Sequence, residues 1–257
     1  MDETVQFYEK GSGHSTFFAK DGVYLSVTHQ PLIALSPGGC IDRGEGEKNG
    51  TDSTSDLVKL SFLNANPNPQ IIAEGKQEGI VNYFIGNDPK KWRMNIPTYQ
   101  AIVYQEVYPG IDIKFYGNSR QMEYDIVVKP GADPSKVRLA YEGIEKLGVA
   151  ENGDLEILLK GGNVIQKKPV VYQEIRGKRV SVEGRFKIQN REPGLNRMKH
   201  RAGSAQYAYT FEISSYDKEH RLIIDLVLVY SSYLGGNDQD FPYSVAVDNV
   251  GNFYVAG

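Results

Sequence analysis

The stretch Asn82–Pro134 decides the fold, and it reads NYFIGNDPKKWRMNIPTYQAIVYQEVYPGIDIKFYGNSRQMEYDIVVKPGADP. Runs rich in Tyr, Phe, Val and Ile alternate in it with clusters of Gly, Asn, Asp and Pro. Aromatic and β-branched residues favour strands, and the clusters are typical of turns. The stretch therefore predicts a meander of antiparallel strands, at Val81–Ile85, Tyr99–Tyr104, Ile111–Tyr116 and Met122–Val128.

The rest of the chain continues this pattern of short strands and tight turns. Asp21-Gly22 separates His14–Ala19 from Val23–Thr28 and is a strong hairpin signal. Asn152-Gly153 and Arg176-Gly177-Lys178 predict two further hairpins. Other strands are expected at Val5–Tyr8, Leu57–Leu63, Val137–Tyr141, Val164–Gln166, Gly184–Gln189, Tyr207–Ser214 and Leu222–Val229. The sequence thus predicts an all-β fold of roughly 14 short strands, either an antiparallel β-sandwich-like domain or a large β-roll.

Composition excludes several classes of protein. The chain has 257 residues, 40% hydrophobic and 24% charged, which suffices for an ordinary core. Its formal net charge of −3 provides no basic footprint for nucleic acid. No run approaches the about 18 apolar residues that a membrane-spanning helix needs. The single cysteine, Cys40, cannot form an internal disulfide, and we expect it to be a free loop thiol.

Two segments lack the apolar residues that a strand needs to pack. The segment at about 37–55 is rich in Gly, Ser, Asp, Glu and Lys, and we expect a mobile surface loop there. The segment at about 190–204 contains Arg191, Arg197, Lys199, His200 and Arg201. This second segment is interpreted as a basic, solvated loop.

Several strings carry a resemblance to a known family. NYFIGNDP, VYPGIDI, MEYDIVV and KPVVYQEI resemble the uncharacterised N-terminal domain of bacterial surface proteins, in which this domain precedes a β-propeller built from SBBP repeats. The tail Tyr230–Gly257 is similar to one such repeat, which Tyr233-Leu234-Gly235-Gly236 opens. The predicted domains are therefore residues 1–228, an all-β domain, and residues 229–257, a single SBBP-type repeat.

The resemblance also implies a setting. A propeller needs about four to eight blades, so we expect one repeat to be the truncated start of a longer array. The resembling proteins are exported, which implies a secreted or cell-surface location, although residues 1–4 do not start a signal peptide. The implied partners are C-terminal propeller repeats or a neighbouring surface protein. The family brings no established activity.

Catalytic and metal-binding patterns are weak. His14, His29, His200 and His220 are scattered, and neither a phosphate-binding glycine loop nor a Gly-x-Ser-x-Gly elbow is present. Glu123 and Asp125 share a strand face, with Asp112 expected on the next strand. This set fits either a glycosidase pair or an exposed face balanced by Lys114, Arg120 and Lys129. Asp238 and Asp240 resemble the alternating oxygen ligands of a calcium loop, but their run is too short and no distal Glu follows. We therefore expect no catalytic residue, no metal and no cofactor.

The candidate ligand-binding residues are Trp92, Tyr99 and Arg93. Trp92 follows Asp88-Pro89-Lys90-Lys91 between two strands, where a Trp beside cations can stack on a sugar or anchor an interface. The alternative is that Trp92 closes one end of the core.

The leading functional hypothesis is a non-enzymatic structural or adhesion module, extracellular or at the cell surface, that precedes and caps a β-propeller. One alternative is a carbohydrate-binding module with a glycan as partner. Another is a subunit of an extracellular fibre whose lone blade is completed by strand exchange with a neighbour. A glycoside hydrolase using Glu123 and Asp125 ranks last.

Overall fold

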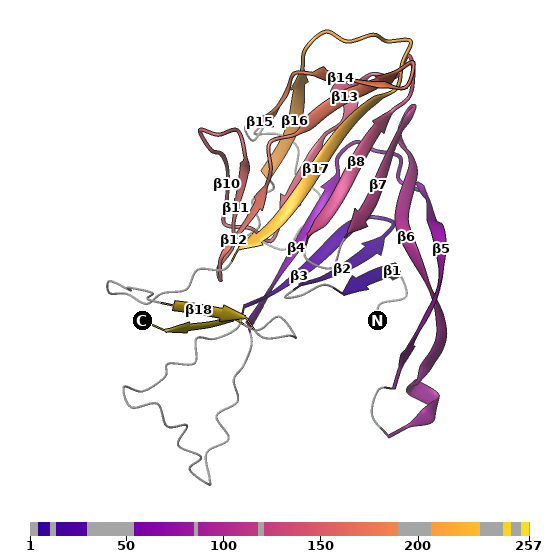
Figure 1. The fold of residues 1–257 in the computed structure, drawn as a ribbon, viewed down its shortest axis with the longest axis vertical. Coiled ribbons are helices and arrows are strands. Elements are labelled where there is room, and N and C mark those ends of the chain that lie inside the picture. The colour runs from indigo at the N-terminus through magenta and orange to yellow at the C-terminus, as the bar shows by residue number, and fades with distance from the viewer. Residues whose placement is uncertain are drawn as a thin grey trace, which may run out of the picture.

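A computed structural model gives the fold of residues 5–10, 14–29, 54–84, 87–117, 121–189, 207–231, 244–247 and 253–256. Within these residues two antiparallel sheets face each other, and a small separate pair of strands lies near the C-terminus (Figure 1). The predicted loops at about 37–55 and 190–204 lie outside the described residues, except that the first strand residues of β4 overlap the former.

The first sheet has seven strands and contains the N-terminal hairpins. Their spatial order is β1 (Val5–Lys10), β2 (His14–Ala19), β3 (Gly22–His29), β4 (Thr54–Phe62), β9 (Leu139–Glu142), β16 (Tyr207–Ile213) and β15 (Gly184–Gln189). β1 is therefore an edge strand, and within the described residues it pairs only with β2.

The second sheet has ten strands and holds the central meander. Its main path is β10 (Lys146–Val149), β11 (Leu155–Leu158), β12 (Asn163–Gln166), β17 (Leu222–Ser231), β8 (Met122–Val128), β7 (Ile111–Gly117), β6 (Arg93–Tyr108) and β5 (Gln70–Tyr83). β13 (Val170–Ile175) also pairs with β17, and β14 (Lys178–Val182) pairs with β13. Short 3₁₀ turns stand at η1 (Pro89–Lys91) and η2 (Pro134–Lys136).

The core lies between the two sheets. Alternate residues of β7 and β8 are buried, as the period of two in their sequences predicts. They meet alternate residues of β2–β4, β9 and β16 in one hydrophobic cluster. The predicted all-β fold is thus confirmed, and of the two arrangements left open the sandwich is the one observed.

A buried polar cluster joins the sheets at the centre of this core. Gln166 from β12 is fully buried; its amide donates to the Tyr124 hydroxyl at 2.8 Å, and its carbonyl oxygen accepts from Tyr141 at 2.9 Å and Tyr209 at 3.2 Å. The hydroxyls of Tyr124 and Tyr209 are 3.1 Å apart. Each polar group of this cluster thereby finds a partner, which a dry interior requires.

β5 and β6 were predicted as short strands, and this is wrong. They have 14 and 16 residues and extend past the sandwich as a twisted two-stranded arm, at the lower right of Figure 1. Beyond Lys76 and Tyr99 the two strands pair only with each other among the described residues. The segment 70–80 contains Gly75 and Gly79 and few apolar residues, so it lacks the local signal of a strand.

The remaining pair of strands belongs to the tail. β18 (Ser244–Val247) and β19 (Phe253–Ala256) form an antiparallel hairpin within the segment that resembles a propeller repeat.

Candidate functional site

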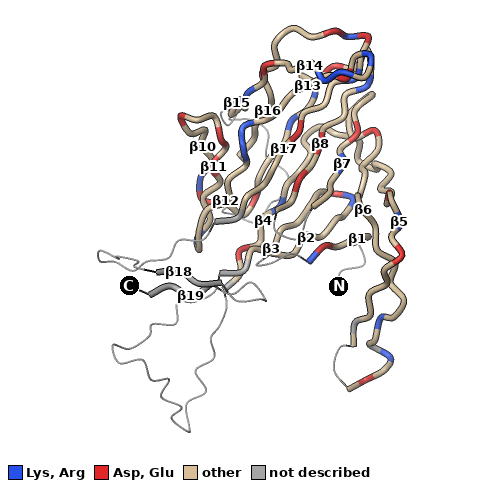
Figure 2. The backbone as a smooth tube through the Cα atoms, viewed as in Figure 1, with Lys and Arg blue, Asp and Glu red and all other residues tan. Residues whose placement is uncertain are grey.

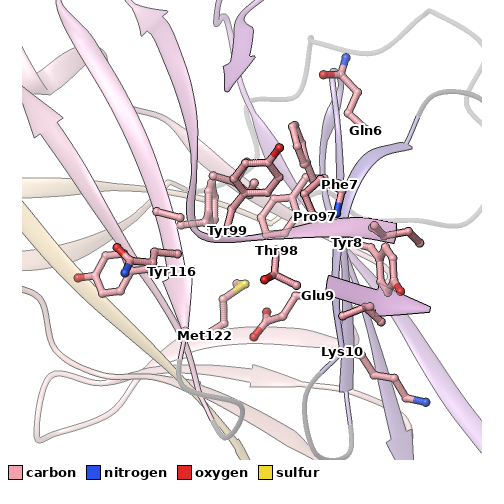
Figure 3. A pocket seen from close by; sticks show the side chains of 18 residues that line it. Gln6, Phe7, Tyr8, Glu9, Lys10, Pro97, Thr98, Tyr99, Tyr116 and Met122 are labelled. Carbon is pink, nitrogen blue, oxygen red and sulfur yellow. The ribbon is translucent and has the colours of Figure 1, made fainter. Parts of the chain in front are cut away.

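A hollow of about 380 Å³ opens where the edge strand β1 faces β6 and β7 of the other sheet (Figure 3). Six of the 18 residues that line it are aromatic. The aromatic residues that line it are Phe7, Tyr8, Phe18, Tyr99, Phe115 and Tyr116. Phe7 and Tyr99 face each other across the opening, with ring centroids 6.3 Å apart and planes at 88°. We call this hollow the edge groove.

One carboxylate points into the edge groove. Glu9 on β1 lies opposite Thr16 on β2, and its side chain is directed toward Thr98 and Met122 (Figure 3). Burial raises the pKa of Glu9, and its hydrogen bond with Thr16 offsets only part of this shift. Among the described residues no Lys, Arg or His forms an ion pair with Glu9. Within the described residues the groove thus combines aromatic side chains with a carboxylate that forms no ion pair.

The end of the arm is a second exposed site. Asp88 caps η1 by accepting from the Lys90 backbone N–H at 3.1 Å, and Trp92 follows as the C-terminal cap. Trp92 is half-buried against Phe84, with centroids 5.1 Å apart and planes at 89°. It therefore lies on the arm and does not close the sandwich core. Three apolar side chains near it remain exposed: Ile80 at 58%, Phe84 at 61% and Met94 at 58%.

The predicted ligand-binding residues do not form one site. Trp92 and the exposed Arg93 lie together at the end of the arm, whereas Tyr99 lies in the edge groove at its base. Tyr99 follows Arg93 by six positions on β6, which corresponds to about 20 Å of strand. Sequence reasoning missed Glu9, because its position in the groove depends on a pairing between distant parts of the chain.

The outer face of the ten-stranded sheet carries the predicted acidic set. Glu123, Asp125 and Asp112 do alternate onto that face, since the intervening residues of β7 and β8 are buried. Lys114 lies beside Asp125, and Lys129 contacts Asp112 and Glu106 instead. Arg120 lies outside the described residues. The sequence did not reveal Asp225, which stands directly opposite Asp125 in the β8–β17 register.

Burial and charge act together on this acidic pair. Burial raises the pKa of Asp125 to about 6, and the neighbouring Asp225 adds to the shift, while the Tyr116 hydroxyl, which donates to Asp125 at 3.0 Å, lowers it. A hollow of about 410 Å³ borders Asp125, with Lys114, Tyr172, Glu174 and Arg221 in its lining. The Arg179 guanidinium covers the Tyr172 ring at 3.4 Å, so this face of the ring is not open for stacking on a sugar.

We expect Asp125→Asn to stabilise the fold at pH 8 by about 1 kcal/mol, with the gain vanishing near pH 4. The folded-state pKa is raised, so the unfolded chain releases its proton first as pH rises from about 4 to about 6, and the fold loses stability in that window. A full two-unit shift corresponds to about 3 kcal/mol, which solvent screening at this partly exposed site reduces. Urea unfolding at pH 4 and pH 8 measures the difference.

Asp133→Asn provides a control of opposite sign. Its side chain accepts from the Ser135 backbone N–H at 3.0 Å, and hydrogen bonding lowers the pKa of Asp133. Because the pKa of Asp133 is lower in the folded state than in the unfolded chain, its ionised carboxylate stabilises the fold at pH values above the unfolded-state pKa. Asp133→Asn removes this carboxylate, so the variant should lose stability at pH 8. If both substitutions change the free energy of unfolding equally at pH 4 and at pH 8, the opposite pKa shifts of Asp125 and Asp133 are contradicted.

Metal and membrane features can be assessed only for the described part of the chain. There, no group of three His, Cys, Asp or Glu side chains is placed to hold a metal ion, and no helix is long and apolar enough to cross a membrane. His200, Cys40, Asp238 and Asp240 lie outside the described residues, as does the side chain of His29.

Comparison with known families places the two parts of the chain. Residues 1–225 match the model of a domain of unknown function (DUF7948), and residues 229–257 match a β-propeller repeat (SBBP). The two matches meet inside β17, and no curated protein matches the chain. With a match over most of its length, the chain belongs to the DUF7948 family and carries an SBBP β-propeller repeat directly behind that domain.

Proposed function

We propose that this chain is a non-enzymatic module of a secreted or cell-surface protein, which holds SBBP propeller repeats on its sandwich as one rigid body for adhesion or assembly. The observation that carries the proposal is the path of β17. This strand begins in the core of the sandwich, and its last three residues already belong to the propeller repeat.

The hydrogen-bond register supports a stiff junction. Val229, Tyr230 and Ser231 pair with Ile165, Val164 and Asn163 of β12, so the first residues of the repeat are part of the ten-stranded sheet. On the other side, β17 pairs with β8 from Leu222 to Leu228. Domain boundaries that allow free motion normally lie in exposed, flexible linkers with few contacts. Here the boundary lies within a paired strand, and this favours a fixed orientation of the propeller repeat.

The arrangement of polar groups also supports a binding role over catalysis. The acidic pair on the outer sheet face is balanced by Lys114 and Arg179, and the edge groove holds a single carboxylate. General acid and base catalysis by carboxylates requires two groups on opposite sides of a substrate bond. The edge groove offers one such group with aromatic surface around it, which is typical of recognition.

Insertion of eight Gly and Ser residues after Ser231 tests the rigid junction. Nitrogen relaxation of the backbone amides at 244–247 and 253–256 reports how fast the repeat tumbles. In the native chain we expect the rotational correlation time of these amides to equal that of β8 amides. The insertion should shorten it several-fold, because the repeat then moves on a flexible linker.

The same insertion between Arg176 and Gly177 is the matched control. It lengthens the turn of the β13–β14 hairpin and leaves β17 intact, so tumbling of the repeat should not change. Faster tumbling of the repeat than of the sandwich in the unmodified chain would refute the proposed role as a rigid carrier.

A further inference from the structure

The arm presents a surface that the rest of the described chain does not cover. An isolated two-stranded hairpin is only marginally stable in water, and the distal half of the arm has no third strand among the described residues. Its exposed side chains Ile80, Phe84 and Met94 add apolar area at the same place. Exposed apolar patches of this kind commonly mark interaction sites.

The end of the arm is also basic. Asp88-Pro89-Lys90-Lys91-Trp92-Arg93 has three cations and one anion, and Figure 2 shows the basic residues close to the end of the arm. Arg93 is exposed and forms no ion pair within the described residues. The tip therefore offers apolar and cationic groups side by side.

The edge groove offers the complementary features. Six of its lining residues are aromatic, and its single inward carboxylate, Glu9, lacks a cation among the described residues. Lys10 also lines the groove, but Figure 3 shows its ammonium directed away from Glu9. A guanidinium group entering the groove could pair with Glu9 and lie against aromatic rings, two interactions that favour Arg in buried contacts.

The position of the groove on the arm determines whether the guanidinium group comes from the same molecule or from a second copy of the chain. Val81, Ile96, Pro97, Thr98 and Tyr99 of the arm line the groove, which begins about 10 Å of strand from Phe84 and Arg93 and extends to about 20 Å at Tyr99. An arm cannot fold its own tip back onto its base without breaking its strand pairing. Two arms laid antiparallel around a twofold axis, however, place each tip at the base of the other. Such an isologous contact is self-complementary and closed.

We propose that two copies of this chain form a dimer by reciprocal arm contact, in which Phe84 and Arg93 of each copy enter the edge groove of the other and Arg93 pairs with Glu9. The contact buries the exposed apolar side chains of the arm and gives the groove carboxylate its counter-ion. It also gives the distal half of each hairpin a neighbour.

Charge reversal tests the pairing on the full chain by sedimentation velocity. Glu9→Arg places two guanidinium groups at each contact of a homodimer, and Arg93→Glu places two carboxylates there. Because like charges at an interface repel, each variant alone should dimerise at least about 100-fold more weakly than the native chain. An equimolar mixture of the two variants should form a heterodimer with native-like affinity, because both contacts then pair an arginine with a glutamate.

The mixing result separates contact between copies from effects within one copy. Glu9→Gln, which preserves shape, should weaken the dimer about tenfold with an unchanged circular dichroism spectrum, so a folding defect in Glu9→Arg cannot mimic the result. Glu156→Arg, at an exposed position of β11, is the control and should leave dimerisation unchanged. A native chain that stays monomeric at about 100 µM would overturn the proposal, as would a mixture that fails to associate.

Discussion

Replacing Gln166 with leucine is expected to lower the free energy of unfolding by about 3 kcal/mol. Gln166 is fully buried and makes three hydrogen bonds, to Tyr124, Tyr141 and Tyr209, which come from three different strands of the two sheets. A leucine side chain fills a similar volume but neither donates nor accepts a hydrogen bond. The substitution therefore leaves three tyrosine hydroxyls with only one another as partners in a dry core, and each lost hydrogen bond to a buried polar group costs about 1–3 kcal/mol.

Two further variants show whether the polar cluster is the cause. Combining Gln166→Leu with Tyr141→Phe should recover part of the lost stability, because it removes one of the hydroxyls that lost a hydrogen bond to Gln166. Gln189→Leu, which loses only the 2.9 Å bond from Arg138 at the sheet periphery, should cost less than about 1 kcal/mol. Urea unfolding gives all three values. Equal losses in Gln166→Leu and Gln189→Leu would show that the cluster contributes nothing special.

Local chemistry made much of this fold predictable. Asp21-Gly22, Asn152-Gly153 and Arg176-Gly177 turn the chain within a few residues, and each hairpin forms as expected. The buried faces of β7 and β8 follow from a period of two in a few consecutive residues. Such features depend only on neighbours in sequence.

Sheet order and the sites depend on distant pairings instead. β9 inserts between β4 and β16, elements separated by long stretches of chain, and no local pattern specifies this order. Asp225 meets Asp125 only because β17 returns beside β8, and Glu9 lies near Thr98 and Met122 only because the two sheets pack. The aromatic content of the segment indicated Tyr99. No local pattern in the sequence indicated Glu9, the residue that provides the carboxylate of the edge groove.

The arm shows how tertiary context overrides a local rule. Pro97 lies within β6, where a proline removes a backbone donor and argues against a strand. On the arm β6 pairs on one side only, opposite Ile80, so the missing donor can face outward. Proline and glycine weaken the local strand signal in this segment. The sequence therefore did not predict the long β5–β6 arm, which distinguishes this sandwich from an ordinary one.

Gly143 follows β9 at a point where two strands of the first sheet come very close. Its φ is +82°, in the left-handed region that glycine adopts readily. A Cβ built at this position would lie 2.4 Å from the Leu57 carbonyl oxygen of β4. That oxygen is part of the backbone of a core strand, so relief of the clash requires β4 or β9 to shift against the packed core.

Gly143→Ala is therefore expected to destabilise the fold by about 3 kcal/mol or more, the sum of the left-handed penalty and the displaced strand. Gly131→Ala separates these two contributions, because Gly131 has nearly the same φ of +76° but no heavy atom within 4 Å of the added Cβ. The control should cost only about 1 kcal/mol. Urea unfolding midpoints compare the two variants. If Gly143→Ala proves no more harmful than Gly131→Ala, then backbone conformation, and not the close approach of β4, explains the glycine.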